Sequence, residues 1–115
     1  MPIVKLQPII YVTDMDRSEA WYRQLLGTDP AAASPHWTSF AVGDGQLALH
    51  ATDVAEARGP VELSLIADEP LEQIAQRVGF TDPITDEAFG RSLKLVDPDG
   101  CSVQVNEHDP DLYDH

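Results

Sequence analysis

Two patterns of apolar residues run through the chain, one with the period of a strand and the other with that of a helix. Alternation of apolar and polar residues predicts six strands, at residues 6–13, 37–42, 46–51, 61–67, 91–96 and 101–107. Helical spacing predicts helices over residues 15–26 and 70–78, with Asp14 as the N-cap of the first and Pro70 at the first position of the second. Residues 28–36 read as a loop or a poor edge strand, and residues 80–89 as irregular.

The predicted elements occur in the same order twice, as strand–helix–strands, with a boundary near residue 58. Each half is too short to bury its own sheet, so we expect the two sheets to join into one curved, mixed surface covered by helices on its outer face. The fold class is therefore α+β, with module 1 at about 1–57 and module 2 at about 58–115 in a single domain, 1–115.

Each predicted strand has one aliphatic face, which suits packing under a helix. The opposite face is mixed, and two interpretations of it stay open: a pocket with a few placed polar groups, or an exposed antiparallel face. Trp37 or Phe40 belongs with this face, depending on the parity of their strand. The other residues on it are Gln7, Tyr11, His50, Glu62, Ser64, Gln104 and Asn106.

Composition restricts the possible functions. The 115 residues suffice for one domain with a core, and 43% hydrophobic residues is ordinary for a soluble protein. The single cysteine, Cys101, excludes an internal disulfide framework and any multi-cysteine metal site. The sequence has neither an apolar run long enough to span a membrane nor a signal-peptide layout, so we expect a cytoplasmic protein.

The chain is strongly acidic: 7 Lys and Arg against 20 Asp and Glu give a net charge of −13. Nucleic-acid binding needs a basic surface, which this balance argues against. The acidic residues either form a solubilising surface or provide a field that attracts a cationic ligand. Composition does not choose between these two interpretations.

Four segments in register resemble the vicinal oxygen chelate superfamily, which includes glyoxalase I, extradiol dioxygenases, fosfomycin-resistance enzymes and bleomycin-resistance proteins. They are YVTDMDRSEAWYRQLLG, FAVGDGQLALHA, VELSLIADEPLEQI and GRSLKLVDPDGCSVQVNE. The resemblance implies two tandem βαβββ modules, a concave cleft inside the curved sheet, and a homodimer.

The resemblance also assigns four metal-ligand positions, which fall on Gln7, Ala48, Glu62 and Gln104. Ala48 cannot bind a metal, and relatives that bind metal have glutamate at the position of Gln104. His50 lies on the same face as Ala48 and could substitute for it. Sites for transition metals need three or four imidazole or carboxylate ligands, so we favour no metal cofactor, with Ni, Zn, Fe or Mn as the alternative.

The segment AFGRSLKLVDPDG is similar to bleomycin-resistance proteins, which are acidic, free of metal and bind a cationic drug. We therefore expect a metal-independent protein that sequesters an aromatic or cationic natural product in a homodimer, as in antibiotic resistance. In this hypothesis Tyr11, Trp37, Phe40 and Phe89 stack on the ligand, and Gln7, His50, Glu62 and Gln104 orient it.

Two other functions stay open. The first is a metal-dependent lyase, isomerase or dioxygenase of the same superfamily, in which Glu62 could be the general base. The second is a non-catalytic dimerising or regulatory protein. Glu62 could also pair with a cationic ligand, with Lys94 or with Arg91.

Overall fold

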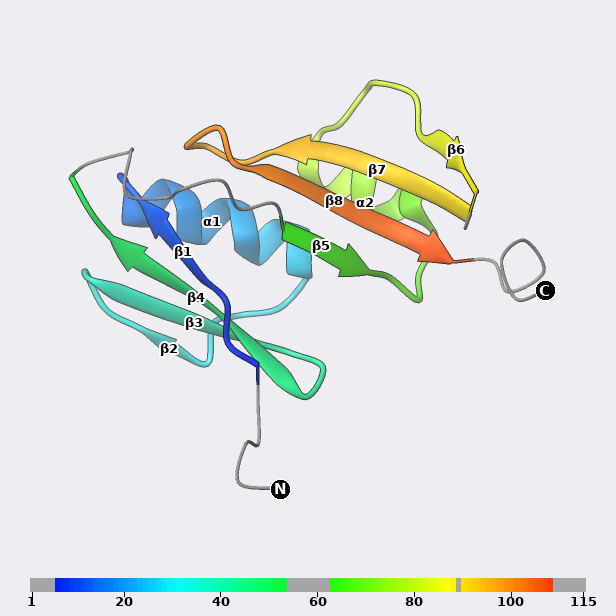
Figure 1. The fold of residues 1–115 in the computed structure, drawn as a ribbon. Helices are drawn as coiled ribbons and strands as arrows, with labels where there is room; N and C mark the ends of the chain where they lie inside the picture. The colour runs from blue at the N-terminus through cyan, green and yellow to red at the C-terminus, as the bar shows by residue number, and fades with distance from the viewer. Residues whose placement is uncertain (1–5, 54–62, 89, 109–115) are drawn as a thin grey trace. The chain divides into compact units, whose positions relative to one another are not determined.

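The structure, a computed structural model, describes residues 6–53, 63–88 and 90–108, and the chain forms two compact units, Met1–Pro60 and Val61–His115. Within the described residues, each unit contains one helix and one four-stranded mixed sheet (Figure 1). The element order in both units is strand–helix–strand–strand–strand, which confirms the α+β class and the tandem βαβββ repeat. That the two units make a single domain stays a prediction.

The two sheets have the same topology. The strand order is β1-β4-β3-β2 in unit 1 and β5-β8-β7-β6 in unit 2. In each, the first strand runs parallel to the last, and the other pairs are antiparallel. The elements are β1 (Ile9–Val12), α1 (Met15–Leu26), β2 (Ala32–Ala33), β3 (Trp37–Val42), β4 (Gly45–Ala51), β5 (Leu63–Ile66), α2 (Leu71–Val78), β6 (Thr85–Glu87), β7 (Gly90–Val96) and β8 (Ser102–His108).

Capping residues determine where α1 begins and ends, and both ends lie at the predicted residues. Asp14 has extended backbone angles, and its Oδ1 accepts a hydrogen bond from the backbone N–H of Arg17 at 3.2 Å, as an N-cap does. At the other end, Gly27 adopts the left-handed conformation with φ 68°, and its N–H donates to the carbonyl of Arg23. Only glycine takes this conformation without steric cost, so the helix stops there.

Two predicted features of unit 2 need correction. Helix α2 begins at Leu71, because Pro70 has the extended ψ of 135° and is the N-cap rather than the first helical residue. The stretch expected to be irregular contains β6, which has no apolar alternation to reveal it. The Thr85 hydroxyl donates to the carbonyl of Ser92 on β7 at 3.3 Å, so a polar contact reinforces this edge strand.

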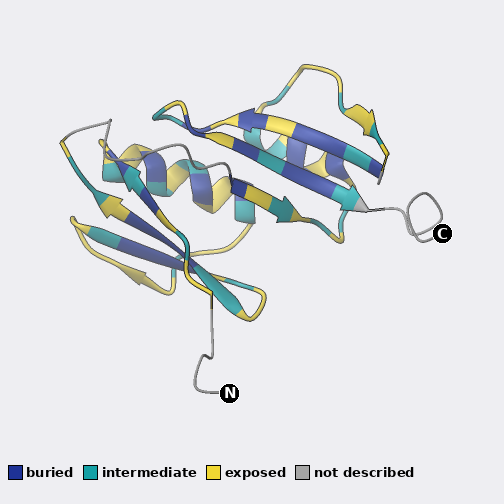
Figure 2. Ribbon diagram, in the orientation of Figure 1, coloured by how far each residue is buried: buried dark blue, intermediate teal, exposed yellow. Residues whose placement is uncertain are grey.

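The helix in each unit covers one face of its own sheet. Helix α1 packs against β3 and β4, and α2 packs against β7 and β8. Figure 2 shows buried and more exposed residues alternating along β7 and β8. The predicted aliphatic faces are confirmed, and their buried members are Ile10, Val12, Leu47, Leu49, Leu63, Val103 and Val105, joined by Leu93 and Leu95. Neither described helix is long and apolar enough to cross a membrane.

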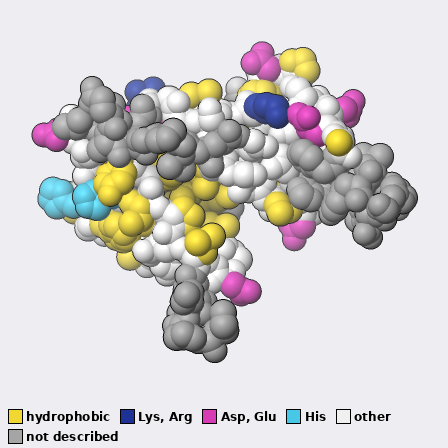
Figure 3. Space-filling view, viewed as in Figure 1, with side chains coloured by type: hydrophobic (Ala, Val, Ile, Leu, Met, Phe, Trp, Pro, Cys, Tyr) yellow, Lys and Arg dark blue, Asp and Glu magenta, His cyan; other side chains and the backbone are white. Residues whose placement is uncertain are grey.

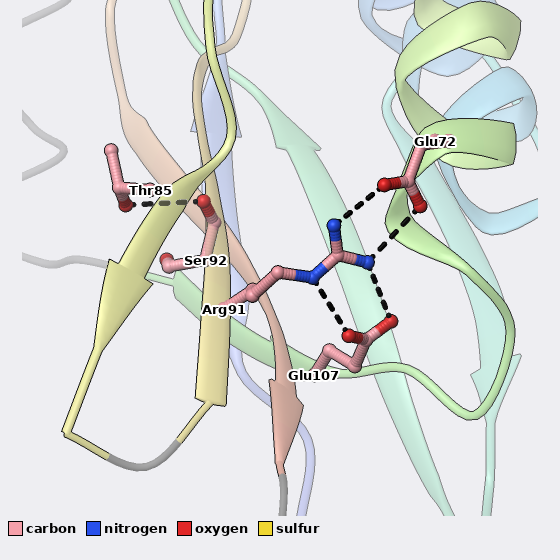
Figure 4. Close-up of polar contacts among 5 residues, drawn as sticks. All are labelled: Glu72, Thr85, Arg91, Ser92 and Glu107. Carbon is pink, nitrogen blue, oxygen red and sulfur yellow. Dashed lines mark hydrogen bonds and ion pairs between the residues drawn. The ribbon is translucent and has the colours of Figure 1, made fainter.

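An arginine fixes α2 to the edge of the buried face of its sheet (Figure 4). Arg91 on β7 donates to both carboxylate oxygens of Glu72 on α2, at 2.6 and 3.1 Å, and to both oxygens of Glu107 on β8, at 2.9 and 3.2 Å. Such bidentate bonds are stronger and more directional than a single ion pair. The hydrogen bonds from Arg91 lower the pKa of Glu72 from 4.5 to about 2, and they raise the pKa of Arg91.

We predict that Glu72→Gln lowers the melting temperature near pH 7, and that this deficit disappears in acid. A carboxylate whose pKa falls on folding stabilises the protein above its unfolded pKa, and this stabilisation is lost as pH falls through the folded pKa. The window runs from about pH 4.5 down to about pH 2. Thermal melts of both proteins across this range test it. Asp82→Asn is the control, because it removes one negative charge at a residue with no ion pair in the described part of the chain. An equal loss of melting temperature in Asp82→Asn would show that the effect of Glu72→Gln does not come from the Arg91 pair.

We also predict that Ser18→Ala stabilises the protein. Ser18 is fully buried in α1, and its hydroxyl has no hydrogen-bond partner among the described residues. Removing an unsatisfied buried hydroxyl and adding helix propensity should raise the free energy of unfolding by about 0.5–2 kcal/mol. Urea denaturation measures the change. Thr38→Val is the control and should lower the free energy of unfolding, because the Thr38 hydroxyl donates to Glu19 Oε1 at 3.3 Å. If Ser18→Ala also lowers the free energy of unfolding, the Ser18 hydroxyl has a hydrogen-bond partner and the prediction is wrong.

Candidate functional site

The face of the unit 1 sheet opposite α1, called here the open face of unit 1, carries three rows of side chains across the strands. Strand register places Trp37, His50 and Tyr11 in one row, and Ala32, Ser39, Ala48 and Ile9 in the next. The third row contains Ala41 and Gln46, and Gln7 joins it because its Nε2 donates to Gln46 Oε1 at 2.7 Å. A row whose side chains are small, apart from Ile9 at its edge, thus lies between an aromatic row and an amide row.

The aromatic row brings three ring side chains into contact. The ring of His50 lies 5.3 Å from that of Tyr11 and 5.9 Å from that of Trp37, with an edge-on angle of 88° to the indole. His50 is exposed, and Nδ1 of its ring lies 2.9 Å from the carbonyl oxygen of Ala51. Figure 3 shows hydrophobic side chains gathered on this face over β3 and β4, with histidine side chains beside them.

Phe40 does not belong to this face, which corrects the prediction. It pairs with Leu47 across the hairpin and is fully buried on the side covered by α1. The reason is the period of two: Trp37 and Phe40 are three residues apart on one strand, so their side chains point to opposite faces. The hairpin register, in which Trp37 pairs with His50, decides which of the two joins the open face.

The open face of unit 2 is polar rather than aromatic. Register aligns Ser64, Gln104 and Lys94 in one row, and Ile66, Asn106, Ser92 and Thr85 in the next. The side-chain amide of Asn106 donates to the hydroxyl of Ser64 at 2.8 Å. Lys94 forms an ion pair with Glu87 at 2.9 Å, which lowers the pKa of that carboxyl.

The structure thus gathers seven of the ten predicted site residues on the two open faces, each within its own unit. Gln7, Tyr11, Trp37 and His50 lie together in unit 1, and Ser64, Gln104 and Asn106 in unit 2. Glu62 and Phe89 lie outside the described residues. Sequence reasoning missed Gln46, although its spacing of four residues from His50 placed it on the same face.

The described residues do not fit a metal ion. Of the four positions that the family resemblance assigns to ligands, three are described: Gln7, Ala48 and Gln104 offer two neutral amides and a methyl group. In the described part of the chain, no three His, Cys, Asp or Glu side chains are grouped so that they could hold a metal ion. Transition metals select imidazole, thiolate or carboxylate ligands, so these residues alone supply no such site.

Comparison with known proteins agrees with this architecture. The model of the glyoxalase/bleomycin resistance protein/dioxygenase superfamily matches residues 4–105. Three solved structures show the same fold. The first is a glyoxalase/bleomycin resistance protein from Catenulispora acidiphila, with 23% identity, a TM-score of 0.77 and coverage of 93% of this chain and 100% of that one. No curated protein sequence matches the chain.

The other two are named for different activities. The bleomycin-binding protein of Streptomyces verticillus, solved with copper(II)-bleomycin, has 14% identity, a TM-score of 0.70 and coverage of 93% of this chain and 98% of that one. A lactoylglutathione lyase from Agrobacterium tumefaciens has 21% identity, a TM-score of 0.70 and coverage of 93% and 95%. At these identities the likeness concerns the fold alone.

We predict that Phe40→Leu destabilises the protein more than Trp37→Leu does. The two aromatic residues share one strand but point to opposite faces, and only Phe40 is fully buried. Replacing Phe40 removes packed volume from the core and should lower the free energy of unfolding by about 1–3 kcal/mol. Trp37→Leu should lower it by less than about 1 kcal/mol. Urea denaturation of both variants measures this, and equal losses would contradict the assignment of faces.

Proposed function

The chain belongs to the glyoxalase/bleomycin resistance protein/dioxygenase superfamily, and we propose that it binds a small aromatic or cationic molecule without a metal. The observation that carries this proposal is the aromatic row of Tyr11, His50 and Trp37 on the open face of unit 1. The proposal includes a homodimer, a cytoplasmic location and a role like that of antibiotic-resistance proteins.

Aromatic side chains on an open sheet face are suited to holding a ligand ring. Trp37 and Tyr11 are only partly buried, and neither lies under the helix. Beside them, Ser39 and Ala48 are buried, so in this proposal the ligand ring contacts the aromatic row itself. Stacking contributes about 0.5–1.5 kcal/mol for each aromatic pair, and a cation over a ring contributes about 0.5–2 kcal/mol.

Charge supports a cationic ligand. The net charge of −13 creates a field that attracts cations to the protein and repels anions. The structurally similar Streptomyces verticillus protein binds copper(II)-bleomycin, which gives this fold a precedent for sequestration. In our proposal Tyr11 and Trp37 stack on the ligand, and Gln7 and His50 on the same open face orient it.

The metal-dependent enzyme is the competing proposal, because the fold is also that of a lactoylglutathione lyase. Native mass spectrometry of untagged protein purified without chelator, combined with elemental analysis, separates the two. A metal-free dimer supports sequestration. About one equivalent of Ni, Zn, Fe or Mn per subunit would overturn metal-independent binding, and loss of that metal in Glu62→Gln would assign Glu62 as a ligand.

We predict that ligands perturb Trp37 and leave Trp21 unchanged. These are the chain's two tryptophans, and Trp21 lies on α1 with its ring edge-on to Tyr22 at 4.8 Å. NMR of protein labelled with ¹⁵N-tryptophan therefore gives two indole signals, assigned with Trp21→Phe and Trp37→Phe. Bleomycin and tryptamine are the probes, and Trp37→Leu should weaken their binding about 2- to 12-fold. Equal responses of both indoles, or none, would contradict a site at the aromatic row.

A further inference from the structure

One buried polar atom on the open face of unit 2 has no partner. Asn106 is 5% exposed, and its Nδ2 donates to the hydroxyl of Ser64 at 2.8 Å. Its Oδ1 is buried and has no hydrogen bond among the described residues. Buried side-chain oxygens nearly always have a partner, so this atom requires a specific explanation.

The direction of the Asn106 side chain is fixed by its neighbours. Val103 and Val105 are buried on the face covered by α2, so Asn106, one residue further along β8, points to the opposite, open face. Its bond to Ser64 on the adjacent strand β5 holds the amide group in one orientation. The Oδ1 atom is therefore a positioned acceptor on the face opposite α2, the helix that the structure describes in unit 2.

We infer that this open face is a polar subsite, in which Asn106 Oδ1 accepts a hydrogen bond from an N–H group of a bound small molecule. An amide oxygen only accepts, so the subsite selects amides, amines or guanidinium groups and disfavours carboxylates, which have no proton to donate at neutral pH. Lys94, which lies on this face in the row beside Asn106, is paired with Glu87. This inference adds a ligand class to the proposed function. It rests on one part of that proposal, namely that the chain binds a small molecule.

An unpaired oxygen kept for a ligand has a measurable signature in the unliganded protein. Leaving a buried acceptor unsatisfied destabilises the fold, whereas an apolar side chain of similar size removes that penalty. Asn106→Leu should therefore melt at a temperature at least as high as the unmodified protein while losing ligand selectivity. Ser18→Ala is the matched control, since Ser18 Oγ is the other unpaired buried side-chain oxygen among the described residues, and it lies in a helix.

The sequence makes the binding test selective. Asn106 is the only asparagine of the 115 residues, so labelling with ¹⁵N-asparagine gives a single pair of side-chain amide signals. The probes are benzamide and N,N-dimethylbenzamide, which share a ring and a carbonyl but differ in their N–H donors. We expect benzamide to shift the Asn106 signals saturably and to bind at least 5-fold more tightly than its dimethyl analogue.

The variants complete the test. Asn106→Leu should abolish the preference for benzamide, and Ser18→Ala should keep it. Ser64→Ala, which retains Asn106 but frees its amide, should reduce the preference and keeps the test informative if Asn106→Leu fails to fold. Equal affinities for the two probes, or Asn106 signals that move with neither, would overturn the inference.

The indole signals separate this result from the proposed function. If Trp37 responds to bleomycin or tryptamine and Asn106 to neither amide, binding at the aromatic row stands and the polar subsite is wrong. If Asn106 responds to benzamide alone while Trp37 responds to no probe, the polar subsite stands and the aromatic row is not a binding site.

Discussion

In the described part of the chain, each unit has a single helix for a sheet with two faces, and most of the structure follows from that constraint. A strand sends alternate side chains to opposite faces, so the residues under the helix must be aliphatic and those between them are free to differ. In unit 1 the covered positions include Leu47 and Leu49, while Ala48 and His50 occupy the open face. Packing under the helix therefore determines half of each strand and leaves the chemistry of the other half free to vary.

The two units show what this freedom allows. Their element order and strand order are the same, yet one open face holds Tyr11, His50 and Trp37 and the other holds hydroxyl and amide groups. Aromatic rings offer large surfaces for stacking, whereas amides offer directional hydrogen bonds. The same architecture thus carries aromatic groups on the open face of one unit and hydrogen-bonding groups on the open face of the other.

Sequence predicted the elements that carry strong local signals and missed those that depend on pairing. Helix α1 was predicted to the residue, because Asp14 caps it and Gly27 ends it. Strand β6 was missed, since Thr85–Glu87 has no apolar alternation and is held by contacts with β7. The face of Phe40 needed the register of the hairpin, which alternation within one strand does not supply. The open-face residues were identified, but the free Oδ1 of Asn106 depends on a partner 42 residues away.

The two sides of the unit 2 sheet differ in their polar groups, with the ion pairs of Arg91 on the side of α2 and an amide hydrogen bond on the open face. On the side of α2, Arg91 is satisfied by two carboxylates, Glu72 and Glu107. On the open face, Gln104 and Asn106 are neutral amides, and the buried oxygen with no hydrogen bond among the described residues is Asn106 Oδ1. A buried carboxylate needs a cation to balance it, whereas a buried amide needs only hydrogen bonds. The amides of this face therefore carry no charge that a cation would have to balance, and directional hydrogen bonds are what they offer to a partner.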